Sequence, residues 1–318
     1  MTLTELRYIV TLAREQHFGR AAEKCFVSQP TLSIAVKKLE DELNVALFER
    51  SKNAVRLTDV GQRIVEQAQK VLQQAETIKD LAQFGKDQLK SPLRVGAIYT
   101  IGPYLFPHLV PEVRKIAPDM PLYIEENFTA RLREKLRNGE LDAIIIALPF
   151  EEPDVVTRVM YDEPFVMLLP KGHQWCDQKQ IDSSALADTE LLMLGEGHCF
   201  RDQVLESCPT LTQAIAQQNS VTEGSSLETI RMMVASGLGA SVLPISATQG
   251  HYQSNLVETR PFKSPQPIRT VAIAWRASFP RPHAIDVLVD AVSHCSMPLE
   301  QGKAQLSGAS TAEQTETA

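Results

Sequence analysis

The sequence lacks any run of 18 or more apolar residues, so it offers no helix long enough to span a membrane. Residues 1–7 also lack the basic segment and apolar stretch of an export signal. We therefore expect a cytoplasmic protein with no membrane partner. Cysteine is scarce, with 5 among 318 residues, and in the cytosol so few cysteines do not indicate a structural disulfide framework.

The chain also lacks the excess of positive charge that is typical of nucleic-acid-binding proteins, because its net charge is −7. The distribution of charge is more informative. Residues 1–60 contain 9 Lys and Arg against 8 Asp and Glu, a balance of +1, which leaves −8 for the remainder. Only the N-terminal segment is therefore a candidate to approach phosphate, through a local face.

Apolar periodicity in this segment predicts three short helices, over residues 2–16, over residues 19–25 and from residue 29 onward. Ser28 is a suitable N-cap for the third helix, and Pro30 falls in its first turn, where a missing N–H costs little. Three short helices with a tight turn between the last two are typical of a helix-turn-helix.

One face of the third helix is apolar and predicts a buried stripe, and the opposite face is short, polar and basic. A hairpin with three cations is predicted to follow over residues 47–58, as the wing of a winged helix-turn-helix. In isolation such a polar face is more often simply solvated, but exposed apolar residues beside it suit thymine methyl groups, and wing cations suit phosphates. The candidate DNA-binding residues are Gln29, Pro30, Thr31, Ser33, Ile34, Lys37, Lys38, Arg50, Lys52 and Arg56.

A long helix is predicted from Thr58 to about residue 88, with a seam of apolar residues spaced 4, 3, 4, 3 and 4 apart. Nothing adjacent in the sequence is expected to cover this seam, so the pattern predicts a coiled-coil dimerisation helix. The seam consists of Ile64, Ala68, Val71, Ala75, Ile78 and Ala82.

From residue 93 the pattern changes to alternating strands and helices, which predicts open α/β sheets in two lobes with a cleft between them. The expected fold is α/β with an all-α N-terminal part. It comprises a winged helix-turn-helix (1–58), a coiled-coil linker helix (59–90) and a two-lobed, periplasmic-binding-protein-like regulatory domain (91–297). The lobes are expected at 91–162 with 269–297, and at 163–268, followed by a disordered polar tail at 298–318.

Two cysteines stand nine residues apart in the second lobe. Cys199 is expected near a helix N-terminus beside His198 and Arg201, and such surroundings stabilise a thiolate. If residues 199–208 are helical, the Cα atoms of Cys199 and Cys208 lie about 13.5 Å apart at ~1.5 Å per residue. A disulfide needs roughly 4.4–6.8 Å, so this bond requires the backbone to move.

The N-terminal residues resemble the LysR-type family of bacterial transcriptional regulators. The resemblance rests on Phe18-Gly19-Arg20-Ala21-Ala22, Val27-Ser28-Gln29-Pro30-Thr31-Leu32-Ser33, Lys38-Leu39-Glu40-Asp41-Glu42-Leu43, Leu47-Phe48-Glu49-Arg50, Leu57-Thr58 and Gly61. Within this family, residues 197–203 together with Cys208 resemble the peroxide-sensing members. The resemblance implies a homotetrameric activator, built from two dimers, that binds promoter DNA, works with RNA polymerase and needs no cofactor.

The resemblance further implies that hydrogen peroxide oxidises Cys199 to a sulfenic acid, which Cys208 converts to a disulfide. The peroxide-binding residues are then expected to be Thr100 and Thr129, at strand-to-helix corners, with His198 and Arg201.

The same sequence features are compatible with other functions. One alternative is a LysR-type regulator that responds to a small organic effector in the cleft between the lobes, with Cys199 incidental. A thiol peroxidase would use the same two cysteines, but needs neither a helix-turn-helix nor a dimerisation seam, so we do not expect an enzyme. The cysteine spacing also lacks the short pairs of zinc sites, so no metal is expected. Cys25, Cys176 and Cys295 are interpreted as packing residues.

Overall fold

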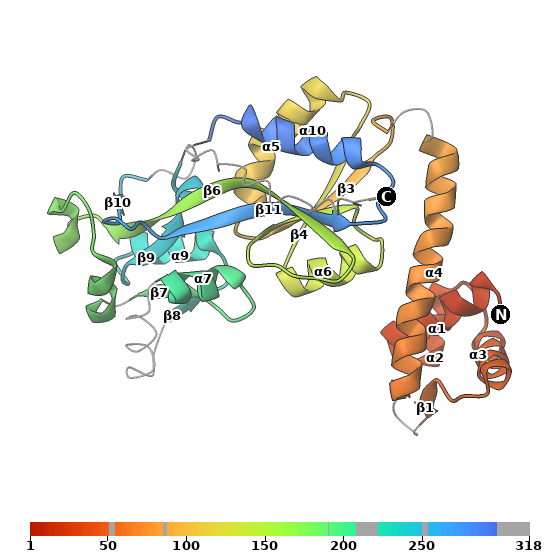
Figure 1. Ribbon diagram of the computed structural model, residues 1–318. Helices are drawn as coiled ribbons and strands as arrows, with labels where there is room; N and C mark the ends of the chain where they lie inside the picture. The colour runs from red at the N-terminus through yellow and green to blue at the C-terminus, as the bar shows by residue number, and fades with distance from the viewer. Residues whose placement is uncertain (51–54, 85–87, 190, 208–221, 250–253, 298–318) are drawn as a thin grey trace, which may run out of the picture. The chain divides into compact units, whose positions relative to one another are not determined.

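The computed structural model describes residues 1–50, 55–84, 88–189, 191–207, 222–249 and 254–297. The chain divides into two compact units (Figure 1). The first contains residues 1–90 with two short later segments, 137–140 and 278–282, and the second contains the rest. Within the described ranges, no helix is both long enough and apolar enough to cross a membrane.

The first unit begins with three helices whose ends are capped by side chains. Thr2 and Glu5 form a capping box on the first, His17 caps the second, and Ser28 caps the third, where Pro30 occupies the first turn. A two-stranded antiparallel hairpin follows. The predicted winged helix-turn-helix is thus confirmed, with α1 (Leu3–Glu15), α2 (Phe18–Lys24), α3 (Gln29–Leu43), β1 (Phe48–Arg50) and β2 (Val55–Leu57).

The predicted apolar stripe of α3 forms the centre of this unit, since Leu32, Val36 and Leu39 are fully buried. The long helix α4 (Asp59–Phe84) packs against the same core through Val65 and Ala68. The prediction that nothing in the chain covers the seam of α4 is therefore wrong for its first half. The later seam residues Val71 and Ile78 are exposed, at 37% and 69%.

The second unit is built on a mixed sheet with helices on both faces, and two of its parallel strands, residues 93–98 and 143–147, are largely buried. Helices α5 and α10 cover one face and α6 covers the other (Figure 1). The strand order is β10-β6-β11-β5-β3-β4, and the central strand β5 is entirely apolar and buried. The elements are β3 (Leu93–Ile98), α5 (Gly102–Ile116), β4 (Leu122–Asn127), α6 (Thr129–Arg137), β5 (Ala143–Ala147), β11 (Ile268–Arg276) and α10 (Pro282–Ser293).

One strand runs through both lobes. β6 (Val155–Pro170) pairs with β11 over its first ten residues and with β9 (Ser241–Pro244) and β10 (Val257–Pro261) over its last six. The sequence predicted only residues 165–169 as a strand, because the preceding stretch includes the polar or charged residues Thr157, Arg158, Asp162 and Glu163. Strand β10 was not predicted either.

The second lobe confirms the expected alternation of strands and helices. β7 (Leu192–Leu194) and β8 (Thr222–Gly224) are parallel, and Ser226 caps the helix that follows β8. Phe165 and Phe200 are buried edge to face in its core, with ring centroids 5.1 Å apart. The remaining elements are α7 (Cys199–Ser207), α9 (Leu227–Ala235) and the 3-10 helices η1 (Gln174–Asp177), η2 (Ser183–Asp188) and η3 (Ile245–Thr248).

Candidate functional site

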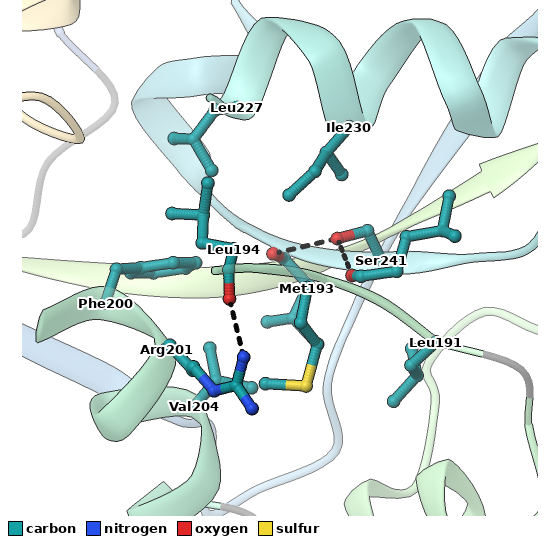
Figure 2. Close-up of a pocket in the computed structure, with 11 residues that line it drawn as sticks. Leu191, Met193, Leu194, Phe200, Arg201, Val204, Leu227, Ile230 and Ser241 are labelled. Atoms are coloured by element: carbon teal, nitrogen blue, oxygen red, sulfur yellow. Dashed lines mark hydrogen bonds between the residues drawn. The ribbon is translucent and has the colours of Figure 1, made fainter. Parts of the chain in front are cut away.

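Cys199 is the first residue of α7, as the sequence predicted. The turn before it needs a glycine, because Gly197 has a φ of +91°. Helix α7 is held to the lobe by Phe200 and Val204, which are both only 3% exposed. Figure 2 shows these two side chains at a small apolar pocket, opposite Leu227 and Ile230 of α9. Apolar packing thus fixes the position of the thiol.

The Cys199 thiol is half-buried, and burial is the largest influence on its ionisation. Desolvation raises the pKa of Cys199, while a side-chain hydrogen bond with Thr129 and the charge of Arg269 lower it less strongly. The nearby Asp202 carboxylate adds to the rise. The resting thiol is therefore protonated at neutral pH, in contrast to the thiolate that its helix N-terminus and neighbouring cation suggested.

Arg269 belongs to a buried network that the sequence did not reveal. Its guanidinium forms an ion pair with Glu163, with 2.6 Å between Nη2 and Oε2, and both side chains are at most 1% exposed. Nη1 donates to the hydroxyl of Thr100 at 3.0 Å, and Nη2 donates to its carbonyl oxygen at 2.8 Å. Glu163 also accepts a hydrogen bond from the backbone N–H of Ser246 at 2.9 Å.

This network brings together three of the expected site residues. Thr100 follows β3, Thr129 begins α6 and Cys199 begins α7, and Arg269 links Thr100 electrostatically to the thiol. Apart from its interaction with Cys199, the buried hydroxyl oxygen of Thr129 has no hydrogen-bond partner among the described residues. A small polar molecule beside the sulfur is therefore offered a hydroxyl that can form a further hydrogen bond, and a buried site rarely leaves such capacity unused.

His198 lies next to the thiol in an aromatic cluster. Its ring is 4.8 Å from that of Phe128 and 6.2 Å from that of Tyr99 between centroids, and the residue is 8% exposed. Burial lowers the pKa of His198, although a hydrogen bond to the backbone of Ser225 opposes this. The imidazole is therefore neutral at pH 7 and can accept a proton.

Arg201, the expected cation beside the thiol, is engaged elsewhere. It forms an ion pair with Glu223 and donates to the carbonyl oxygen of Leu194 at 3.2 Å, a bond drawn in Figure 2. The cation that acts on the pKa of Cys199 is Arg269. Arg201 instead ties α7 to the strand pair β7–β8.

Cys208, the expected second thiol, lies outside the described residues, and α7 ends one residue before it. The other cysteines resemble Cys199 in burial, since Cys25, Cys176 and Cys295 are also half-buried and unpaired. Burial alone thus does not distinguish Cys199. What distinguishes Cys199 is that the hydroxyl of Thr129 and the guanidinium of Arg269 act on its sulfur.

The predicted DNA-contact face of α3 is open to solvent. Gln29, Pro30 and Lys37 are exposed, and the apolar Ile34 is 69% exposed. Ser33 is half-buried, and the hydroxyl of Thr31 lies 2.8 Å from that of the capping Ser28. The face therefore combines an exposed cation with uncovered apolar groups, as base and sugar contacts require.

The other residues that were predicted to contact DNA differ in whether their side chains are exposed or already paired. Lys38 forms an ion pair with Glu5, with 3.1 Å between Nζ and Oε1. In the hairpin, Arg56 is exposed and lies opposite Glu49 in the strand register. The backbone of Arg50 ends β1, whereas Lys52 lies outside the described residues.

Two family models match the chain. Residues 3–62 match the bacterial regulatory helix-turn-helix protein, lysR family, and residues 86–296 match the LysR substrate binding domain. The two matches coincide with the winged helix-turn-helix and with the two-lobed sheet that carries Cys199.

Three similar proteins carry the name OxyR. The DNA-binding transcriptional dual regulator OxyR of Escherichia coli K12 is 37% identical over 92% of this chain and 95% of its own length. A full-length cysteine-to-aspartate variant of OxyR from Pseudomonas aeruginosa is 66% identical over 95% of this chain and 99% of that chain, with a TM-score of 0.76. A peroxide-bound cysteine variant of OxyR from Corynebacterium glutamicum is 33% identical over 92% of both chains, with a TM-score of 0.62.

Proposed function

Because this chain belongs to the LysR family of bacterial transcriptional regulators, we propose that it is a transcriptional activator of the oxidative-stress response, switched by hydrogen peroxide at Cys199. One observation carries the proposal. The Cys199 sulfur lies at a helix N-terminus against the otherwise unpartnered hydroxyl of Thr129 and within the field of the buried Arg269. The names of the relatives, among them a hydrogen peroxide-inducible genes activator, support it.

The proposed chemistry is a two-electron oxidation. The sulfur of Cys199 attacks one peroxide oxygen as its proton leaves, the O–O bond breaks, and the departing hydroxide takes up a proton to become water. Neutral His198 is proposed to move that proton, and the hydroxyls of Thr100 and Thr129 to hold the peroxide. The thiol of Cys208 then attacks the sulfenic sulfur, which releases a second water and leaves a disulfide.

The raised pKa of Cys199 fits a sensor that rests in an unreactive state. Because burial keeps the thiol protonated, attack needs the peroxide to be positioned and the proton to be removed within the site. Arg269 and Thr129 are proposed to stabilise the negative charge that develops on sulfur. Arg201, held by Glu223, is proposed to position α7.

The disulfide is proposed to remodel the second lobe. Helix α7 extends from Cys199 to Ser207, so its two ends lie about 12 Å apart at ~1.5 Å per residue. A disulfide between Cys199 and the residue after this helix requires Cα atoms roughly 4.4–6.8 Å apart, so α7 must unwind or leave its position. That movement is proposed to change how the regulator binds promoter DNA and contacts RNA polymerase.

We further propose a cytoplasmic homotetramer built from two dimers. The exposed second half of the α4 seam, with Val71 and Ile78, supports pairing of two linker helices. Such a dimer presents two copies of α3 to two half-sites on DNA. The proposed domains are 1–58, 59–90 and 91–297, with lobes at 91–162 with 269–297 and at 163–268.

Treatment of the reduced full-length protein with near-stoichiometric hydrogen peroxide tests the sensor. We expect a disulfide between Cys199 and Cys208, mapped by mass spectrometry of alkylated peptides within seconds to minutes of mixing. Formation of this bond should precede modification of Cys25, Cys176 and Cys295. A Cys199 that stays reduced while another cysteine is oxidised first contradicts the proposal.

The DNA-contact face is tested by Lys37→Ala. Removing the charge that neutralises a phosphate should weaken binding at low salt and flatten the plot of log K against log salt by about 0.9 for each phosphate left without its lysine. The matched control is Lys171→Ala, which removes an exposed lysine of the second unit and should leave the slope unchanged. Equal slopes for both variants refute the assignment of Lys37.

A further inference from the structure

Helix α2 ends in a Schellman motif. The N–H of Val27 donates to the carbonyl oxygen of Ala22, and the N–H of Phe26 donates to that of Glu23, both at 3.0 Å. This pattern requires a left-handed residue between the helix end and Val27, and that position usually holds glycine, or sometimes asparagine. The residue here is Phe26, with a φ of +57°.

Helix α3 of the same unit shows the usual solution. It ends with the same pair of hydrogen bonds, from Asn44 to Asp41 and from Val45 to Glu40, at 3.3 and 3.1 Å. Its left-handed residue is Asn44, with a φ of +53°. A phenylalanine in the equivalent place is a local conflict between residue and backbone, and such outliers persist mainly where they serve a function.

The ring of Phe26 does not contribute to the core of the unit. The residue is 95% exposed, more than any other large apolar residue among those described. The apolar contact that accompanies a Schellman motif is available to the next residue, because Val27 is half-buried and packs on the core. Folding of the turn therefore needs the left-handed backbone at this position but not the aromatic ring.

The position of Phe26 suggests a role for the ring. It lies in the turn of the helix-turn-helix, two residues before Ser28, the cap of α3. When such a helix enters the major groove, its first residues meet the bases, and the turn before it lies over the sugar-phosphate strand that borders the groove. In α3, Pro30 and Ile34 are also exposed and apolar, and both belong to the predicted DNA-contact face.

We propose that Phe26 is a DNA-contact residue whose ring packs against the deoxyribose of the strand that flanks the major groove. The contact is apolar, so it adds affinity without releasing counterions. It extends the helix-turn-helix interface with DNA by a residue that carries neither charge nor hydrogen-bonding capacity in its side chain.

The test replaces Phe26 by the residue that α3 uses at the same place. Binding of full-length protein to a duplex that the wild type enriches from a random pool is followed by fluorescence anisotropy at several salt concentrations. Phe26→Asn should lower affinity about five- to tenfold at every salt concentration, with an unchanged salt slope. Its melting temperature should equal or exceed that of the wild type, because Asn suits the left-handed backbone.

Two comparisons make the test decisive. Phe26→Tyr keeps the ring and should bind like the wild type, whereas Lys37→Ala should change the slope that Phe26→Asn leaves unchanged. Wild-type affinity in Phe26→Asn overturns the proposal, as does a change in sedimentation without DNA, which would assign the ring to contact between copies of the chain. Failure of the wild type to enrich any duplex would instead count against DNA binding as such.

Discussion

A Cys199→Ser protein is expected to stay in its reduced-state mode of DNA binding after peroxide treatment, so induction of a target promoter should fall to the untreated level. Serine lacks the sulfur that peroxide oxidises, so neither the sulfenic acid nor the disulfide forms. The substitution leaves Phe200 and Val204 in place, and these two residues anchor α7 in the core. Promoter occupancy and induction of a reporter, each with and without peroxide, provide the measurement.

The matched control for this variant is Cys176→Ser. Cys176 lies in the same lobe, is also half-buried and unpaired, and its thiol donates to the carbonyl oxygen of Pro170 at 3.6 Å. Serine retains that hydrogen bond, so the control should respond to peroxide as the wild type does. Loss of DNA binding in the reduced Cys199→Ser protein would instead make Cys199 a structural residue, and an intact peroxide response would remove it from the mechanism.

The second large effect is expected from Arg269→Met. This change leaves the carboxylate of Glu163 buried without its cation, which typically costs on the order of 3–5 kcal/mol of unfolding free energy. It also removes a positive charge that lowers the pKa of Cys199, so that pKa should rise further. Chemical denaturation measures the first effect, and the pH dependence of iodoacetamide alkylation at Cys199 measures the second.

The double variant Arg269→Met with Glu163→Gln separates the two effects. Removing both charges should restore most of the unfolding free energy, because no uncompensated ion remains. Cys199 should still be alkylated more slowly than in the wild type at neutral pH, since the thiolate fraction falls as the pKa rises. Alkylation that follows the wild-type pH profile in the double variant would show that Arg269 acts only on folding.

Most of the fold followed from local patterns. Helices α1 and α3 were predicted because they repeat their apolar residues at helical period, and Ser28 indicated the start of α3 as a capping residue. Strands such as β5 were predicted because they are short apolar runs between turns. Cys199 was correctly placed at the start of α7 from the glycines before it and the helix expected after it.

The residues that the sequence missed depend on distant partners. Arg269 follows Ile268 and precedes Thr270 in β11, so locally it looks like a polar residue on the exposed face of a strand. Its burial depends on Glu163, which is 106 residues away in the chain. The sequence did contain one signal, since Glu163 and Arg269 are opposite charges next to apolar strand residues. To recognise them as partners, however, one needs to know the register in which β6 pairs with β11. The burial of Ala68 by its own domain required tertiary contacts in the same way.

The buried ion pair of Glu163 and Arg269 also lies at the boundary between the two lobes. Glu163 and Arg269 face each other in the register of β6 and β11, next to the point where β6 passes from its pairing with β11 to its pairing with β9. β6 contributes residues to the sheets of both lobes, so the two lobes share one strand of 16 residues. The electrostatic partner of the thiol, Arg269, is thus paired to the strand that the lobes share. We expect oxidation to act first on α7, the local segment that begins at Cys199.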